Sequence, residues 1–442
     1  MCIRSVVCVL TLLLSAGAEA GIAGKVSRTK TESIDLIVYR TNLKDVVTII
    51  GSIPAGDAFA SGASAAVPTL TGMMLDQGTT REDKYAIAQK LENAGASITF
   101  GVDTQVVDIR ARCLARDLPM VIGLIADELR APAMSPAEFE KARQHLIGAL
   151  QGSKDNSSYR ARDTFNRAVF PPGHPNHPQT IESLVKSTQS ATVADIKAFH
   201  QKYYGPSNMI LVFVGDVDAP RVKRAITKSF AGWTGGAGVL PAPEAAKPAP
   251  ERLETIELEQ KPSVTILMGQ ATGLKYRDPD TLALRLGASV LGAGFTSRLM
   301  SSVRDREGLT YGIGAGVGDD AFTDGAFFIS ATFAPQLLDK GLASTRRELR
   351  KWWAEGIKPE EFKDHQQNLI GLYQVGMSTS GGLAGALMTT AQRGLDLDWL
   401  DRYPSLIRSL TPKQVDAAIK KHLDPDKMIL VEVGTLKGGT MP

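Results

Sequence analysis

The chain repeats a long segment of its own sequence, and this duplication limits the possible folds more than any other feature. Thr192 to Gly215 reads TVADIKAFHQKYYGPSNMILVFVG, and Thr411 to Gly434 reads TPKQVDAAIKKHLDPDKMILVEVG, in register and without a gap. Each copy predicts an amphipathic helix, a turn at a proline and a buried strand. The period is far longer than that of a solenoid, so the pattern indicates one duplicated domain rather than an array of short repeats.

Two shorter matches precede these copies in the same order. The pairs are Val47-Thr48-Ile49 with Val264-Thr265-Ile266, and Pro136-x-Glu138-Phe139 with Pro359-x-Glu361-Phe362. Between the halves lies GWTGGAGVLPAPEAAKPAPE, whose Gly, Pro and Ala content is typical of an extended linker. We therefore expect an N-terminal half at residues 21–231, a linker at 232–253 and a C-terminal half at 254–442.

Each half mixes strands with helices, which predicts an α+β fold. Val107 to Cys113 alternates apolar and polar residues, as expected for a strand with one buried face, and Cys113 falls on the apolar side. Asp117–Arg130 follows with a helical stripe of apolar residues that ends before Pro132. We expect each half to be a mostly antiparallel sheet with helices on one face.

The first 20 residues read as a secretory signal. Arg4 precedes an apolar run from Val6 to Leu14, and small residues allow cleavage after Ala18 or Ala20. The run is too short to cross a bilayer, so we expect a cleaved leader and no membrane span. Because the leader is the only sorting signal found and the mature chain has no disulfide, we expect a periplasmic protein. After cleavage Cys113 is the only cysteine, which excludes an internal disulfide. A net charge of +3 over 442 residues, without a basic cluster, argues against nucleic acid as a partner.

The segment LGAGFTSRLMSSVRDREGLTYGIGAGVG, from Leu291 to Gly318, contains two side chains that can act on a substrate, Arg304 and Tyr311. A helix is predicted from an N-cap at Thr296 or Ser297 to Gly308, with Arg304 in its last turn. A strand then opens with Tyr311, with apolar residues on one face and glycines on the other. The glycines fit no nucleotide-binding motif. Taken alone, such a pair is more often a surface arginine and a core tyrosine, so its interpretation depends on the rest of the sequence.

Over nearly all of its mature length the chain resembles the pitrilysin, insulinase and mitochondrial processing peptidase family of zinc peptidases, in particular its small bacterial two-subunit type. The matching segments are MMLDQGT, KLENAGASITFGVDTQ, FPPGHPNHP, the first helix-turn-strand copy and LGAGFTSRLMSSVRDREGLTY. The resemblance implies two related halves that close like a clam on an extended peptide. It also implies that Arg304 and Tyr311, seven residues apart in the second half, act on the substrate at a zinc site.

The zinc motif of that family, His-x-x-Glu-His on a helix, is missing here. Its three functional positions hold Thr69, Gly72 and Met73, and no carboxylate lies between Lys141 and Gly152 to supply a further ligand. These side chains cannot bind Zn²⁺ or activate its water. We therefore expect no metal or cofactor in this chain and a zinc ion in a partner subunit.

The six histidines offer no clear replacement site. His174 and His177 share a proline-rich loop with loosely ligand-like spacing, but no nearby cysteine or carboxylate completes a site. The other four lie on predicted amphipathic helices, and we expect them at the surface or at its boundary: His145, His200, His365 and His422.

Two functions remain open at this stage. The first is the metal-free subunit of a heteromeric zinc peptidase, inactive alone, in which Arg304 and Tyr311 act in trans at the zinc of a His-x-x-Glu-His partner on a peptide or unfolded substrate. Tyr hydroxyl and Arg guanidinium groups are suitable donors to the oxyanion of a scissile carbonyl. The alternative is a non-catalytic peptide-binding or scaffolding protein of the cell envelope, in which both residues are remnants.

Overall fold

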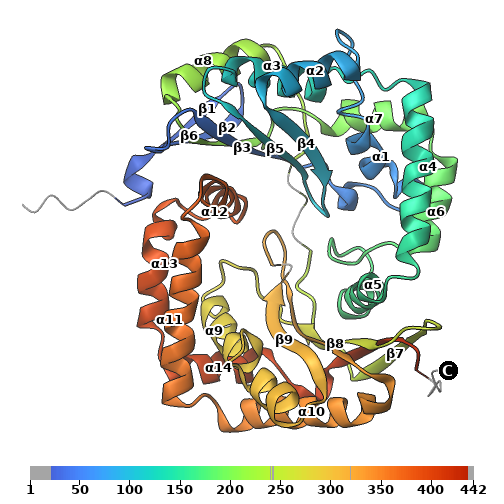
Figure 1. The fold of residues 1–442 in the computed structure, drawn as a ribbon, viewed down its shortest axis with the longest axis vertical. Helices are drawn as coiled ribbons and strands as arrows, with labels where there is room; N and C mark the ends of the chain where they lie inside the picture. Colours follow the sequence, from blue (N-terminus) through green and yellow to red (C-terminus); the bar gives the residue numbers. More distant parts are fainter. Residues whose placement is uncertain (1–20, 239, 241–242, 319, 437–442) are drawn as a thin grey trace, which may run out of the picture.

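The structure is a computed structural model that describes residues 21–238, 240, 243–318 and 320–436. The predicted leader lies outside the described residues. Figure 1 shows most of the N-terminal elements, in blue and green, in the upper part of the molecule and the C-terminal elements, in yellow to red, in the lower part. Each half contains one sheet, so the predicted α+β class with two related halves is confirmed.

The first half contributes these strands and α-helices: β1 (Val26–Thr31), β2 (Ile34–Arg40), β3 (Val46–Ile53), α1 (Val67–Met73), α2 (Lys84–Ala94), β4 (Ser97–Val102), β5 (Val107–Leu114), α3 (Leu118–Arg130), α4 (Pro136–Ser153), α5 (Ser157–Val169), α6 (Ile181–Ser190), α7 (Val193–Tyr203), β6 (Ile210–Gly215) and α8 (Ala219–Phe230). Three short 3₁₀ turns accompany them: η1 (Ala23–Lys25), η2 (Asp57–Phe59) and η3 (Gly62–Ser64).

The second half contributes these elements: β7 (Arg252–Glu257), β8 (Val264–Ala271), α9 (Thr281–Gly292), the π-helix η4 (Met300–Arg306), β9 (Thr310–Gly318), β10 (Ala326–Phe333), α10 (Leu338–Glu355), α11 (Pro359–Gly376), α12 (Ser380–Gln392), α13 (Asp398–Ser409), α14 (Pro412–His422) and β11 (Ile429–Gly434). Two 3₁₀ turns, η5 (Pro335–Leu337) and η6 (Pro425–Lys427), complete it.

The two sheets have the same topology. The first runs β1-β2-β6-β3-β5-β4, and the second runs β7-β11-β8-β10-β9, which is the same order without the extra edge strand β1. In both sheets one pair is parallel, β2 with β6 and β7 with β11, and the other pairs are antiparallel. The duplication inferred from the sequence is therefore a duplication of the whole domain.

The repeated helix-turn-strand segments form in the same way in both halves. Thr192 caps α7 and Thr411 caps α14, each through a reciprocal capping box with the residue three positions later. Each following strand ends at a glycine with positive φ, Gly215 at 146° and Gly434 at 151°. A Cβ at Gly215 would lie 2.1 Å from the carbonyl oxygen of Val46, so this position requires glycine.

Helices cover both faces of each sheet, and one helix of each half packs on the other half. Helix α5 contacts β8 and β11 of the second sheet, whereas α12 contacts β3 and β6 of the first. The first contact buries Phe165 against residues such as Leu267, and the second buries Leu387 beside Val212 and Val214. The expectation of helices on one face only is therefore incomplete, because amphipathic periodicity does not reveal which sheet a helix covers.

The linker forms no helix or strand in its described part, which runs from residue 232 to 251 apart from positions 239, 241 and 242. It still makes a buried contact, since the backbone N–H of Ala246 donates to Asp324 Oδ2 at 2.8 Å. Within the described ranges, the helices are all too short or too polar to cross a membrane.

Candidate functional site

The three positions of the missing zinc motif lie on α1, in the first half. Thr69 Oγ1 donates to Asp57 Oδ1 at 2.7 Å, so its hydroxyl is engaged in a structural hydrogen bond. Gly72 packs so closely that a Cβ there would lie 2.3 Å from Val102 Cγ2. A glutamate at this position would have to displace Val102. The residues present therefore do not fit a zinc ion, either in donor chemistry or in space.

Arg304 and Tyr311 form an exposed aromatic cluster with Phe295 in the second half. The Arg304 guanidinium carbon lies 5.6 Å from the Tyr311 ring centre and 5.4 Å from that of Phe295. Tyr311 is 89% exposed and Phe295 is 73% exposed. This exposure excludes the alternative in which Tyr311 is a core residue. Sequence reasoning missed Phe295, although an aromatic residue at the start of a helical segment next to Arg304 was a usable signal.

The local backbone differs from the expected α-helix. Residues Met300–Arg306 form a π-helix, closed by a bond from the Glu307 N–H to the Ser302 carbonyl. Gly308 ends it with φ of 64°, as predicted. The helical residues begin at Arg298, so Ser297 stands at the predicted N-cap position, and its carbonyl accepts from the Ser301 N–H at 3.0 Å. Its hydroxyl does not cap the helix, because it donates backward to the Gly294 carbonyl. π-Turns inside helices are rare and often occur at functional sites.

Within one chain, the structure does not bring Arg304 and Tyr311 into contact with the positions of the missing zinc motif on α1. In the described residues, the polar and ring contacts of Arg304 and Tyr311 involve only Asp305, Phe295 and each other. No such contact joins them to Thr69, Gly72 or Met73. The exposed Tyr311 and the partly exposed Arg304 beside it are therefore accessible to another molecule.

His174 and His177 have structural partners rather than a metal. His174 is buried, its Nε2 lies 3.0 Å from Asp324 Oδ1, and its Nδ1 accepts from the Asn176 N–H at 3.1 Å. His177 Nδ1 lies 2.8 Å from the Phe170 carbonyl oxygen. Over the described part of the chain, no three His, Cys, Asp or Glu residues are placed to hold a metal ion. His174 and Asp324 instead join the two halves.

Two further expectations concern single residues. Cys113 is buried in β5, as predicted, and burial raises the pKa of its thiol to about 12, which makes it unreactive.

His365 is only 4% exposed, so its expected place at the surface or its boundary is wrong. Burial lowers its pKa, because the charged imidazolium is poorly solvated there. A helical stripe does not show how deep a residue near its edge lies.

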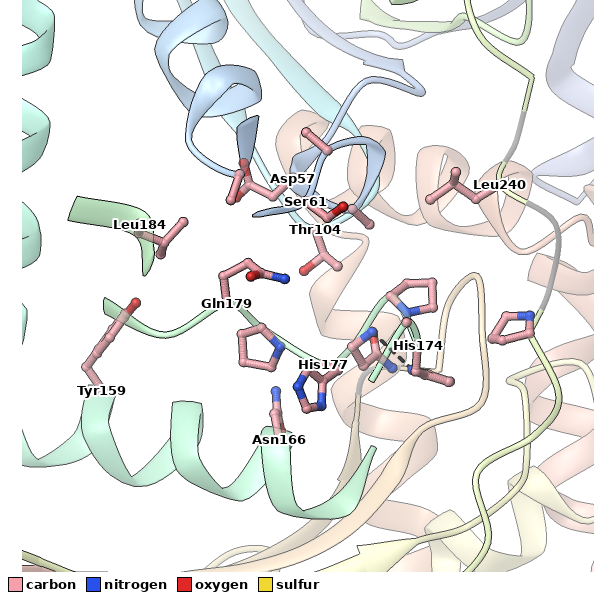
Figure 2. Close-up of a pocket in the computed structure, with 18 residues that line it drawn as sticks. Asp57, Ser61, Thr104, Tyr159, Asn166, His174, His177, Gln179, Leu184 and Leu240 are labelled. Carbon is pink, nitrogen blue, oxygen red and sulfur yellow. Dashed lines mark hydrogen bonds between the residues drawn. The ribbon is translucent and has the colours of Figure 1, made fainter. Parts of the chain in front are cut away.

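A cavity of about 580 Å³ lies beside the N-terminus of α1. Asp57, Thr104, Tyr159, Asn166 and His177 supply much of its polar lining. Figure 2 shows Asp57 on one side of the hollow and Asn166 with His177 on the opposite side. Sequence reasoning did not single out Asp57, which lies in an irregular segment after β3.

Comparisons with known proteins found similar sequences and a similar fold. A family model described as "Peptidase M16 inactive domain" matches residues 190–369. A crystal structure of a peptidase M16 inactive domain from Pseudomonas fluorescens superposes with a TM-score of 0.84 at 25% identity, covering 92% of this chain and 97% of that one. Part of the sequence and the whole fold are therefore similar to the inactive domain of M16 peptidases.

Curated proteins also align with this chain over most of their length. An uncharacterized zinc protease of Streptomyces coelicolor is 24% identical over 398 residues, which cover 85% of this chain and 83% of that protein. The non-peptidase homolog YmxG of Helicobacter pylori is 22% identical over 377 residues, covering 83% and 84%. The names of these two relatives thus differ, one being a zinc protease and the other a non-peptidase homolog.

Proposed function

We propose that this chain is the metal-free subunit of a heteromeric M16 zinc peptidase. It would contribute half of the substrate chamber and the pair Arg304 and Tyr311, and a His-x-x-Glu-His partner would hold the zinc. The likeness to an inactive M16 domain and to a non-peptidase homolog supports the loss of activity in this chain. The periplasm is the proposed compartment, on the basis of the N-terminal leader.

One observation carries the proposal: the Arg304 and Tyr311 side chains are presented to solvent instead of being used in the fold. Tyr311 is 89% exposed, and the guanidinium of Arg304 stacks near its ring. A core role would bury the tyrosine, whereas a role at another subunit's site requires it to be accessible. The phenol and guanidinium donors would then stabilise the oxyanion that forms as the scissile carbonyl is attacked.

The test is reconstitution with an M16 partner from the same organism that carries the zinc motif. Each purified mature chain and their mixture are assayed for peptide hydrolysis, zinc content and elution in gel filtration. We expect no stoichiometric zinc and no hydrolysis for this chain alone, and a complex with higher activity than the partner alone. An obligate interface of this kind buries roughly 2,000 Å² or more. A partner that is fully active alone and forms no complex would instead support the scaffolding function.

A further inference from the structure

The wall of the cavity next to α1 holds a carboxylate without a positive partner. Asp57 receives one side-chain hydrogen bond, from Thr69, and no ion pair involves it anywhere in the described residues. An ionised carboxylate can accept about four hydrogen bonds. Burying such a charge without a cation is costly, so the arrangement provides an unused acceptor site.

The rest of the cavity lining carries no other formal charge. Among the described lining residues Asp57 is the single Asp, Glu, Lys or Arg side chain. The two histidines of the lining have their Nδ1 atoms engaged, His177 toward the Phe170 carbonyl and His174 with the Asn176 N–H. In the neutral His177 ring, the Nδ1 proton donated to Phe170 leaves Nε2 as an acceptor. Asp57 and His177 therefore both offer acceptors to a ligand.

The shape of the cavity suits one side chain or chain end of a polypeptide. Its volume of about 580 Å³ is larger than a single residue needs, and its lining comes from the segment of residues 57–65 before α1, from α5 and α6, and from the loop of residues 173–179. Apolar residues, including Ala65, Leu184 and Pro178, line the remaining wall. Such a lining can contact the aliphatic part of a lysine or the first residues of a peptide.

We propose that this cavity binds a cationic group of an extended peptide, either its N-terminal ammonium or a Lys or Arg side chain, through Asp57 with Thr69 as its positioning residue. The inference rests on the proposed function, because it names the substrate class that this subunit would hold. Thr69 occupies a position where active relatives have a zinc ligand, and here it orients the Asp57 carboxylate instead.

The charge of Asp57 makes this binding dependent on pH. Burial, partly offset by the bond from Thr69, raises the pKa of Asp57 to about 6, and the negative charge of Asp103 adds to the rise. The other titratable groups near it are Tyr159 on α5, Tyr204 after α7, and His177. The carboxylate is ionised above this pKa, so affinity for a cation should fall as the pH decreases through about 6.

The test measures the affinity of the full mature chain for fluorescent peptides by anisotropy. Three peptides share one uncharged sequence: the first has a free N-terminus, the second is acetylated with one internal lysine, and the third is acetylated without any cation. We expect the first or the second to bind at least about tenfold more tightly than the third at pH 8. Whichever of the two binds identifies the source of the cation. Equal affinity for all three would overturn the proposal.

Variants separate the charge from general effects on folding. Asp57→Asn should abolish both the preference for a cation and its pH dependence, whereas Asp155→Asn removes the same charge from an exposed site outside the cavity and should change neither. Circular dichroism checks that both variants are folded, and the pH profile of the unaltered chain gives a test that needs no variant. The peptide-binding assay uses no partner subunit, so a failure to reconstitute an active complex would not change its result. Conversely, a chain that binds no cationic peptide could still form a complex with a partner.

Discussion

At the scale of residues, the structure separates groups that serve the fold from groups that are left available. His174 and Asp324 contact each other in a buried position between the halves, and the Thr69 hydroxyl donates a hydrogen bond to Asp57. The Arg304 and Tyr311 side chains have no comparable contact with the rest of the fold. The spacing of Arg304 and Tyr311 could be recognised in the sequence because it is local. Asp57 could not, because its bond to Thr69 depends on how an irregular segment folds back on α1.

Tyr311→Phe tests whether the phenol takes part in turnover. The hydroxyl is remote from the core, so the variant should fold, assemble with the partner and keep its melting temperature. If the hydroxyl donates to an oxyanion, kcat of the reconstituted complex should fall on the order of a hundredfold. Steady-state kinetics of the complex measure this.

Arg304→Lys serves as the companion variant, because it keeps the charge but loses the planar donors that stack between Phe295 and Tyr311. We expect it to recover little of the activity that Arg304→Ala loses. A Tyr311→Phe complex that turns over at the unaltered rate would remove this chain from catalysis and leave it as a substrate cradle.

Glu128 gives a prediction for stability against pH. It is 1% exposed on α3, and burial, with the charges of Asp76 and Asp127, raises its pKa to about 8 from an ordinary 4.5. Because the folded-state pKa lies above the unfolded one, its ionisation destabilises the fold progressively as the pH rises from about 4.5 to 8. Glu128→Gln should therefore be more stable than the parent at pH 9, by about 1–3 kcal/mol, with no gain at pH 4.

Urea unfolding at both pH values measures this difference. Glu92→Gln is the matched control, since that side chain is exposed on α2 and its removal should have little effect. A constant difference between Glu128→Gln and the parent across the pH range would mean that packing, not ionisation, accounts for it.

At the scale of elements, the sequence correctly predicted those helices, turns and strands that depend on short local patterns. The capped helices, the proline turns and the buried strands of the two copies are each specified within about 25 residues, and the structure has them in both halves. The π-helix at Met300–Arg306 was expected to be an α-helix, because both helix types show similar apolar spacing and the same terminal glycine. The exchange of α5 and α12 between halves depends on long-range packing and could not be predicted from periodicity.

The exchanged helix α12 should contribute directly to stability. Leu387 is fully buried between α12 and the first sheet, so Leu387→Ala should lower the free energy of unfolding by about 2–5 kcal/mol. Leu372→Ala on α11 is the control, because that side chain is 60% exposed and its loss should cost less than about 0.5 kcal/mol. Denaturant unfolding at fixed temperature measures both. Equal effects would show that α12 is not firmly docked on the first sheet.

At the scale of the whole molecule, the duplicated halves are held by more than the linker. Helix α5 packs on the second sheet, α12 packs on the first, and His174 contacts Asp324 between them. An open clam held only by a linker would allow its halves to separate. Reciprocal packing instead fixes the relation between the two halves.

Cutting the linker tests this organisation. A protease site inserted after Pro248, in an exposed part of the linker, allows the folded protein to be cleaved without changing either core. Because the buried contacts of α5 and α12 survive the cut, the two fragments should stay together in gel filtration under native conditions and separate only in denaturant. The calorimetric unfolding of the intact chain should likewise show one transition, since each core includes a helix of the other half. Fragments that elute separately after cleavage, or two resolved transitions in the intact chain, would show that the halves are independent domains joined by a tether.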